Sequence, residues 1–442
     1  MAYHFPWQPF WFIALTIGLV APAHSQSLEQ AVVTTLATDP ELRGAFHQLQ
    51  SLHERTKASE GDYLPDVDLN AGIGYERIDN DTTQAQDDLD FARKDATLNV
   101  RQLVWDGQTH NNIARNRYET ESQRFQLRSD ASDKALQVAE VYLEILKAQQ
   151  VLDLSSANMT VHEEILSDIR RRADTGIGST ADLSQVQARV ARARANLLSA
   201  ETNLEDAFTA FFRVVGEPAN NPVQPVIDDA RLPTSLESAL EQAVKRNPLL
   251  KLARYDIEAA KSQYQQFKGA HHPNISLEVS QTWADEVSGV DDFSDEFSAM
   301  LRVRYQLFNG GSDQADIRRG AYEVNRTKDI FDNAYRQLEE STRLAWSAFQ
   351  LTEQQKVLLQ QQVDAASDTV QAYEKQFRIG RRTLLDLLNT ENELLEARRA
   401  YLNANYDHLL AQYRLLNNTG HLLEALRVSL PEQWQGTEGE TE

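Results

Sequence analysis

Residues Pro65–Glu76 read Pro-Asp-Val-Asp-Leu-Asn-Ala-Gly-Ile-Gly-Tyr-Glu, and apolar positions alternate with polar or glycine positions throughout this stretch. A period of two predicts a β-strand with one apolar face, here about ten residues long. Strands of roughly 9–11 tilted residues with this pattern are typical of transmembrane β-barrels. A single hairpin of this kind also fits an ordinary sheet with one solvated face, so the rest of the chain has to decide between the two.

The alternating pattern occurs four times. We expect strands at about 65–78 and 95–105, and again at about 273–284 and 296–308. A barrel in a membrane tolerates no open edge and needs at least about eight strands. Four strands cannot close a barrel alone, so a membrane location requires several copies of the chain to share one barrel. Three copies would supply twelve strands.

The strands belong to an internal duplication of the chain. Ser27-Leu28-Glu29-Gln30-Ala31 recurs as Ser235-Leu236-Glu237-Ser238-Ala239, and Trp105-Asp106-Gly107 recurs as Phe308-Asn309-Gly310. We therefore expect a first structural repeat over 26–225 and a second over 226–428. Several prolines between 218 and 233 mark the joint. The remaining residues, 429–442, form an acidic tail, and we expect its end, Glu438–Glu442, to be disordered and solvated.

Long helices surround the strands in each repeat. The segments 109–174 and 313–378 contain no proline, and a helix of this length would extend for roughly 100 Å. Shorter helices are expected over 28–60 and 180–215, so that two short helices stacked end to end lie beside one long helix. Apolar residues keep a 3,4 spacing from Leu183 to Phe211, which predicts coiled-coil hairpins over 109–216 and 313–420.

A second apolar row runs along the segment from 387 to 416, in the second repeat. Leu388, Leu395, Leu402, Leu409 and Leu416 recur every seven residues beside a second, mostly apolar row one position earlier. Two adjacent apolar rows indicate contact with neighbouring helices on both sides, as in a closed ring of helices.

Composition excludes several classes of protein. The chain has 442 residues, a formal charge of -22, 44 Lys and Arg against 66 Asp and Glu, and no cysteine. The lack of cysteine excludes disulfides and cysteine-ligated metals. The acidic balance argues against a nucleic-acid partner. Few glycines and prolines (18 and 12) favour long helices.

The first residues have the pattern of a secretory signal. An apolar stretch from Phe10 to Ala21 is too short to span a bilayer, and the small residues Ala23 and Ser25 fit a signal-peptidase site. We expect a signal peptide over 1–25, although its first residues contain no Lys or Arg. A buried N-terminal helix is the alternative. Export without cysteines suggests a bacterial envelope.

Acidic residues crowd the connection inside each expected strand hairpin, at 79–90 and 285–295. We interpret both connections as solvated external loops, with a divalent-cation site as the alternative. No nucleophile elbow, phosphate loop or metal-spaced histidine set occurs, so we expect neither an enzyme nor a cofactor.

Taken together, these features resemble the TolC-type family of outer-membrane efflux and secretion channels. The resemblance covers essentially the whole mature chain. It includes the Leu64-Pro65 and His272-Pro273 starts of the strands and the Trp105-Asp106-Gly107 and Phe308-Asn309-Gly310-Gly311 ends. The most specific motifs are the two helix turns, Gly176–Asp182 and Gly380–Asp386.

The resemblance implies a mainly α fold with a transmembrane β-barrel. It implies a homotrimer in the bacterial outer membrane, with a shared twelve-stranded barrel that continues into a helical tunnel across the periplasm. The tip of the tunnel would dock a periplasmic adaptor and an inner-membrane ABC or proton-driven transporter. Such a chain is a passive conduit for efflux or type I secretion. The alternative is a periplasmic coiled-coil adaptor, although the compact lipoyl-like and barrel domains of adaptors are not evident here.

The resemblance also assigns roles to residues at the helix turns. It implies a gate in which Asp182 bonds Arg382 of a neighbouring coil, supported by an aromatic residue at Phe377, where the family has tyrosine. It implies a pore constriction at Asp386 and Asn389, where the family has two aspartates. The tip turns and adaptor contacts would be Gly176, Gly178, Ser179, Gly380, Thr383 and Leu384.

A purely structural explanation covers some of these residues. Glycine permits the left-handed backbone of a helix reversal, and Ser179 and Thr383 fit N-caps. For the constriction, one carboxylate ring instead of two should weaken block by multivalent cations, while the pore stays cation-selective. The gate predicts that conductance rises when Arg382 is replaced by alanine.

Overall fold

The computed structural model describes residues 26–77, 90–175, 179–287, 292–431 and 434. The expected signal peptide, Gly176 and Gly178, nearly all of the first acidic loop and residues 288–291 of the second lie outside these residues. The first half contains α1 (Leu28–Thr38), α2 (Pro40–Gly61), β1 (Asp66–Ile73), β2 (Glu76–Arg77), β3 (Asp90–Phe91), β4 (Lys94–Trp105), α3 (Gly107–Asp174) and α4 (Thr180–Val215). The second contains α5 (Leu236–Arg246), α6 (Pro248–Gly269), β5 (Asn274–Asp285), β6 (Phe293–Arg304), α7 (Ser312–Arg378), α8 (Leu384–Asn418) and α9 (Leu422–Ala425).

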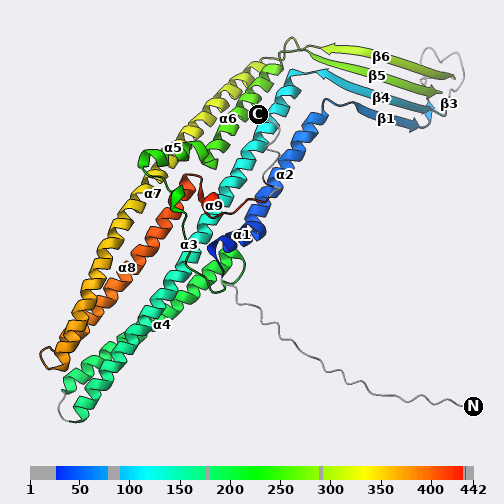
Figure 1. Ribbon diagram of the computed structural model, residues 1–442. Helices are drawn as coiled ribbons and strands as arrows, with labels where there is room; N and C mark the ends of the chain where they lie inside the picture. The colour runs from blue at the N-terminus through cyan, green and yellow to red at the C-terminus, as the bar shows by residue number, and fades with distance from the viewer. Residues whose placement is uncertain (1–25, 78–89, 176–178, 288–291, 432–433, 435–442) are drawn as a thin grey trace, which may run out of the picture.

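Two long helices organise the molecule (Figure 1). Helix α3 packs against α2 along one part of its length and against α4 along the other, and α7 packs in the same way against α6 and α8. The expected stacking of two short helices beside one long helix is therefore confirmed. The sheet lies at one end of the helices, and the α3–α4 and α7–α8 turns lie together at the opposite end (Figure 1). None of the described helices is both long enough and apolar enough to cross a membrane.

The expected helix over 28–60 is interrupted. Helix α1 ends at Thr38, and α2 begins at Pro40 after Asp39, whose backbone is extended (φ -61°, ψ 125°). Pro40 lacks an amide hydrogen, so it cannot continue the hydrogen-bond ladder of α1, but it is well suited to the first position of a new helix. The Asp39 side chain accepts the Leu42 amide at 2.9 Å and caps α2.

The four longer strands form one antiparallel sheet in the order β1-β4-β5-β6. The register places Leu69 opposite Leu98, and Leu277 opposite Leu301. One face of the sheet is therefore mainly apolar, and its side chains are exposed, with Leu69 and Leu301 each 66–67% accessible. Asp68, Asn99, Ser280 and Ser298 share the other face, which carries cross-strand hydrogen bonds.

Two expected strand ends are wrong. Strand β6 stops at Arg304, not 308, where it pairs with Asn274 at the start of β5. The preceding residue, Pro273, has no amide hydrogen to extend the ladder. The pairing of β1 with β4 stops at Ile73, and the chain then forms the separate two-stranded β2–β3 pair. The pairing of β4 with β5 is interrupted by a β-bulge between Leu103 and Trp105.

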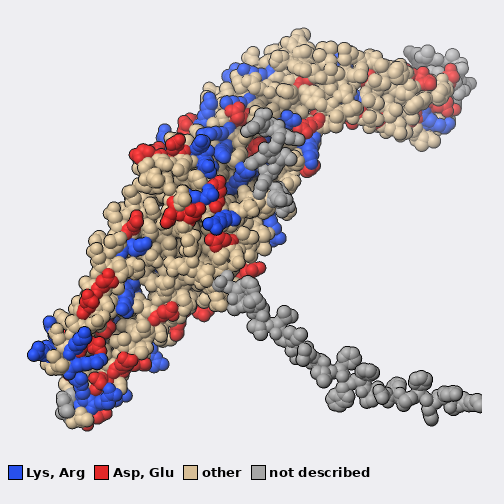
Figure 2. Space-filling view, in the orientation of Figure 1, with Lys and Arg blue, Asp and Glu red and all other residues tan. Residues whose placement is uncertain are grey.

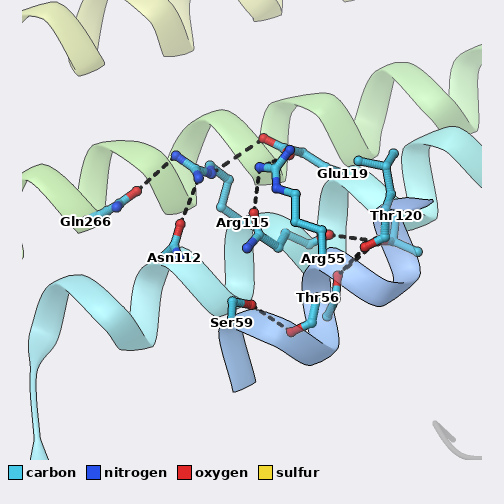
Figure 3. A network of polar contacts seen from close by, with 10 residues as sticks. Arg55, Thr56, Ser59, Asn112, Arg115, Glu119, Thr120 and Gln266 are labelled. Carbon is cyan, nitrogen blue, oxygen red and sulfur yellow. Dashed lines mark hydrogen bonds and ion pairs between the residues drawn. The ribbon is translucent and has the colours of Figure 1, made fainter. Parts of the chain in front are cut away.

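A polar network joins α2, α3 and α6 near the sheet (Figure 3). The Arg115 guanidinium of α3 donates to Gln266 Oε1 of α6 at 3.1 Å and lies 3.5 Å from Glu119. Arg55 of α2 donates to Asn116 Oδ1 and to Glu119 Oε2, both at 2.7 Å. Glu119 of the long helix thus links the bonds made to both short helices close to where the chain enters the strands.

Part of the acidic tail is packed against the helices. Trp434 is 3% exposed, belongs to the largest apolar cluster and stacks on Phe46 of α2, with ring centroids 6.3 Å apart. Leu430 also packs against this cluster. An indole buries a large apolar area, which outweighs the acidic character of the surrounding segment. The acidic tail is therefore packed at Leu430 and Trp434, and the solvated end expected at 438–442 lies outside the described residues.

Three histidines in the helical part are buried: His162, His408 and His421. Burial lowers the pKa of each below its usual value near 6.5. Below about pH 6.5 the unfolded chain therefore binds more protons than the folded chain, and the free energy of unfolding falls as the pH falls.

We expect the unfolding temperature, followed by circular dichroism, to decrease between about pH 6.5 and 5, above the range of most carboxylates. Replacing the three histidines by glutamine should flatten this dependence. An unfolding temperature that is constant or rises over this interval would contradict the prediction.

Candidate functional site

Both helix turns are built from capping residues. Ser179 Oγ accepts the Ala181 amide at 3.1 Å and begins α4. Thr383 and Asp386 form a capping box at the start of α8, with backbone-to-side-chain distances of 3.2 and 3.3 Å. Gly380 has φ +73°, a conformation that side chains other than glycine rarely adopt. These residues therefore have a complete structural role in the reversal of the chain.

An apolar cluster holds the four helices together next to the turns. Ile169 of α3, Val186 of α4, and Leu384 and Leu388 of α8 are all 4% exposed or less. Leu384 was expected to contact an adaptor, but it is enclosed in this cluster and offers almost no surface. The apolar residues that do face outward at the second turn are Ile379 and Leu385, at 67% and 44% exposed.

Arg382 is held by residues of its own hairpin. Its guanidinium lies 4.2 Å from the centre of the Tyr373 ring, donates to Gln376 Oε1 at 3.1 Å and lies 3.9 Å from the Asp386 carboxylate. Stacking of a guanidinium on tyrosine is a favourable cation–π contact. Asp182 lies in the first turn of α4, and within the described part of one subunit it forms no ion pair with Arg382.

Phe377 contacts a different arginine, Arg172. Its ring packs against the apolar cluster at the turns, and the Arg172 guanidinium of α3 lies 5.1 Å from its centre. Phe377 therefore contacts an arginine of the first hairpin. The aromatic residue that contacts Arg382 is Tyr373, one helical turn before Phe377. Tyr373 was not predicted, although its spacing of four residues from Phe377 could have indicated it.

The two expected constriction residues have different partners. Asp386 is engaged by the Thr383 amide and by Arg382. Asn389 Oδ1 accepts a hydrogen bond from Arg189 of α4 at 3.0 Å, which joins the two hairpins. Arg189 was also missed, and no local spacing could have found it, because it lies 200 residues from Asn389.

A groove of about 640 Å³ separates α3 from α7 and α8 near the turns. Its lining is strongly charged, and it includes Asp168, Arg171, Arg172, Glu374 and Glu391. A hydrogen bond from Arg171, supported by Arg172, lowers the pKa of Asp168. Burial, supported by Glu374, raises the pKa of Glu391. Beside the small apolar cluster at the turns, the two hairpins therefore also meet across this charged groove.

Comparison with known proteins decides the family. The family model described as "Outer membrane efflux protein" matches residues 31–217 and 239–421, which is most of the chain. The chain belongs to the outer membrane efflux protein family. It is therefore an outer-membrane channel protein, and the alternative of a periplasmic adaptor is wrong. This is a transport family rather than a family of enzymes.

Several curated relatives extend over nearly the whole chain of this efflux protein. The outer membrane efflux protein BepC of Brucella suis is 25% identical over 404 residues, covering 90% of this chain and 86% of the relative. Outer membrane protein TolC of Vibrio cholerae is 22% identical and covers 93% and 95%. The alkaline protease secretion protein AprF of Pseudomonas aeruginosa is 23% identical and covers 94% and 88%.

Solved structures share the fold of this efflux protein. A structure of CusC matches with a TM-score of 0.79 at 17% identity, covering 89% of this chain and 92% of that one. The outer membrane protein VceC of Vibrio cholerae matches with a TM-score of 0.76 at 17% identity, covering 89% and 96%. The mainly helical architecture with a four-stranded sheet is therefore that of the known outer-membrane channels.

Proposed function

We propose that three copies of this chain form a passive channel whose barrel contains four strands from each copy. The observation that supports this proposal is the sheet: its apolar face is exposed, and β1 and β6 each have only one neighbour among the described strands. In lipid the apolar face is favourable, but open edges are costly. A neighbouring copy can satisfy each edge, and a closed ring of three copies leaves none open.

The chain contains no cysteine, so engineered pairs test this arrangement directly. Asn70→Cys on β1 would be combined in turn with single cysteines along β6, and the native outer membrane would be oxidised. We expect at least one register to give covalent dimers and trimers on denaturing gels without reductant. Monomers in every register, together with recovery of the protein from the soluble periplasmic fraction, would overturn the proposal.

We further propose that the helix turns form the gate of this channel, with Asp386 and Asn389 at its constriction and Asp182 facing Arg382 of a neighbouring coil. The charged groove between the hairpins supports this role, because exposed ion pairs and polar contacts contribute little stability and separate at low cost. Phe377 would act through its packing and its contact with Arg172.

The gate predicts a higher conductance for Arg382→Ala in planar bilayers, by about twofold or more, because one threefold set of closing contacts is removed. Arg381→Ala is the matched control, because it removes another exposed arginine from the same turn. An unchanged conductance in Arg382→Ala, or an equal rise in Arg381→Ala, would contradict the gate.

We also propose a periplasmic adaptor and an inner-membrane transporter as partners, in either an efflux or a secretion system. The relatives are named for efflux and for protease secretion, and both assignments fit a passive conduit. The exposed residues of the turns, including Ser179, Gly380, Thr383 and Leu385, offer a surface for the adaptor. Mild cross-linking in the native envelope, followed by identification of the co-purified proteins, tests this. Recovery without any other envelope protein would contradict it.

A further inference from the structure

The tip of the helical part has a charge balance unlike that of the rest of the chain. Residues 163–194 and 370–394 contain ten Lys and Arg against nine Asp and Glu, whereas the whole chain has a formal charge of -22. Basic side chains are intermixed with acidic ones at this end of the visible face (Figure 2). The negative charge that dominates the molecule is therefore locally compensated where the proposed pore is narrowest.

Arg189 brings positive charge to one constriction residue. Its Nη2 donates to Asn389 Oδ1 at 3.0 Å, across the boundary between the two hairpins. Arg189 also lies near α3: burial lowers the pKa of His162, and the positive charge of Arg189 contributes to the same shift. The guanidinium is thus placed between the hairpins, and the amide that holds it carries no charge to balance it.

The negative charge of the other constriction residue, Asp386, is already balanced by its own neighbours. The Asp386 carboxylate accepts the Thr383 amide and lies 3.9 Å from Arg382, which stacks on Tyr373. Each subunit therefore places one carboxylate and two guanidinium groups within contact of the two constriction positions. Threefold symmetry would multiply this excess, and a narrow pore with low-dielectric walls focuses the resulting field.

We propose that Arg189 determines the charge selectivity of the channel by opposing the Asp386 ring and admitting anions. This inference rests on the proposed trimeric pore and its constriction. The three Arg189 side chains of the trimer would lie along the pore next to the three Asp386 carboxylates, and they would repel cations that approach these carboxylates. The wild-type pore is therefore less selective for cations than the carboxylates alone would make it. Arg189 itself is a selectivity residue and not part of the closing contacts of Arg382.

The test is the reversal potential of single channels in planar bilayers under a gradient of KCl. Arg189→Gln removes the charge and keeps an amide donor for Asn389. We expect it to raise the permeability of potassium relative to chloride by about threefold or more, as expected for removal of a unit charge near a narrow pore. Arg189→Lys keeps the charge and should keep the wild-type ratio.

The matched control is Arg213→Gln, which removes the same charge from an exposed position at the far end of α4. At ordinary ionic strength its field is screened before it reaches the tip, so we expect the wild-type ratio. An Arg189→Gln channel with the wild-type ratio, or an Arg189→Lys channel that shifts as much, would overturn the inference alone. Wild-type protein that forms no channels at all would overturn the proposed function as well.

Discussion

Gly269→Ala is expected to prevent stable assembly of the protein. A Cβ atom at Gly269 would lie 2.6 Å from the carbonyl carbon of Gly107 and 2.7 Å from the amide nitrogen of Gln108. These are backbone atoms of α3, so no side chain can rotate away, and α6 would have to separate from α3 just below the sheet. Overpacking that cannot relax costs about 3 kcal/mol or more. The measurement is the yield of folded protein in the outer membrane and its unfolding temperature.

Two glycines serve as controls for this effect. Gly44 lies inside α2 with nothing within 4 Å of its Cβ position, so Gly44→Ala should stabilise the helix by about 0.5–1 kcal/mol. Gly107→Ala meets its nearest atom at 3.3 Å and should cost less than Gly269→Ala. Wild-type yield and unfolding temperature in Gly269→Ala would show that the two helices can move apart without penalty.

Leu301→Arg is expected to block insertion into the outer membrane. Leu301 is 67% exposed on the apolar face of the sheet and pairs with Leu277 on β5. If this face contacts lipid, an arginine here costs up to about 2–4 kcal/mol in each subunit, the value for the middle of the bilayer. The trimer would bear this cost three times. The measurement is the fraction of protein recovered in the outer membrane and its resistance to added protease.

Ser298→Arg is the matched control on the same strand. Ser298 pairs with Ser280 on the polar face, which would line the water-filled interior. We expect this variant to insert as the wild type does. If both variants insert equally well, the apolar face does not contact lipid. If Ser298→Arg alone fails, the assignment of the two faces is reversed.

Most of the fold could be predicted from local sequence patterns. The bounds of α3, α7 and α4 lie within two residues of the predicted ones, because long proline-free segments with regular apolar spacing leave little choice. The break at Asp39–Pro40 was missed because the helical pattern resumes at once after it. The end of β6 was predicted four residues too late, at 308. The alternation of the sequence continues past Arg304, but the pairing with β5 ends at Asn274, which follows Pro273.

The site was less predictable than the fold. The sequence identified the turns and their caps, since Ser179, Thr383 and Gly380 act on neighbouring residues. It did not find that Leu384 is enclosed, that Tyr373 rather than Phe377 stacks on Arg382, or that Trp434 is packed on α2. In each case the outcome depends on which helix face meets another helix.

Sequence alone determined the lengths of the helices, the alternation of the strands, the two turns and the acidic charge of the chain, because each depends on residues within a few positions of one another. Only the tertiary structure decided that Gly269 lies against Gly107, that Arg115 bonds Gln266, and that Arg189 bonds Asn389. These pairs join segments far apart in the chain. Their geometry follows from how closely whole helices can approach, and no local pattern encodes that distance.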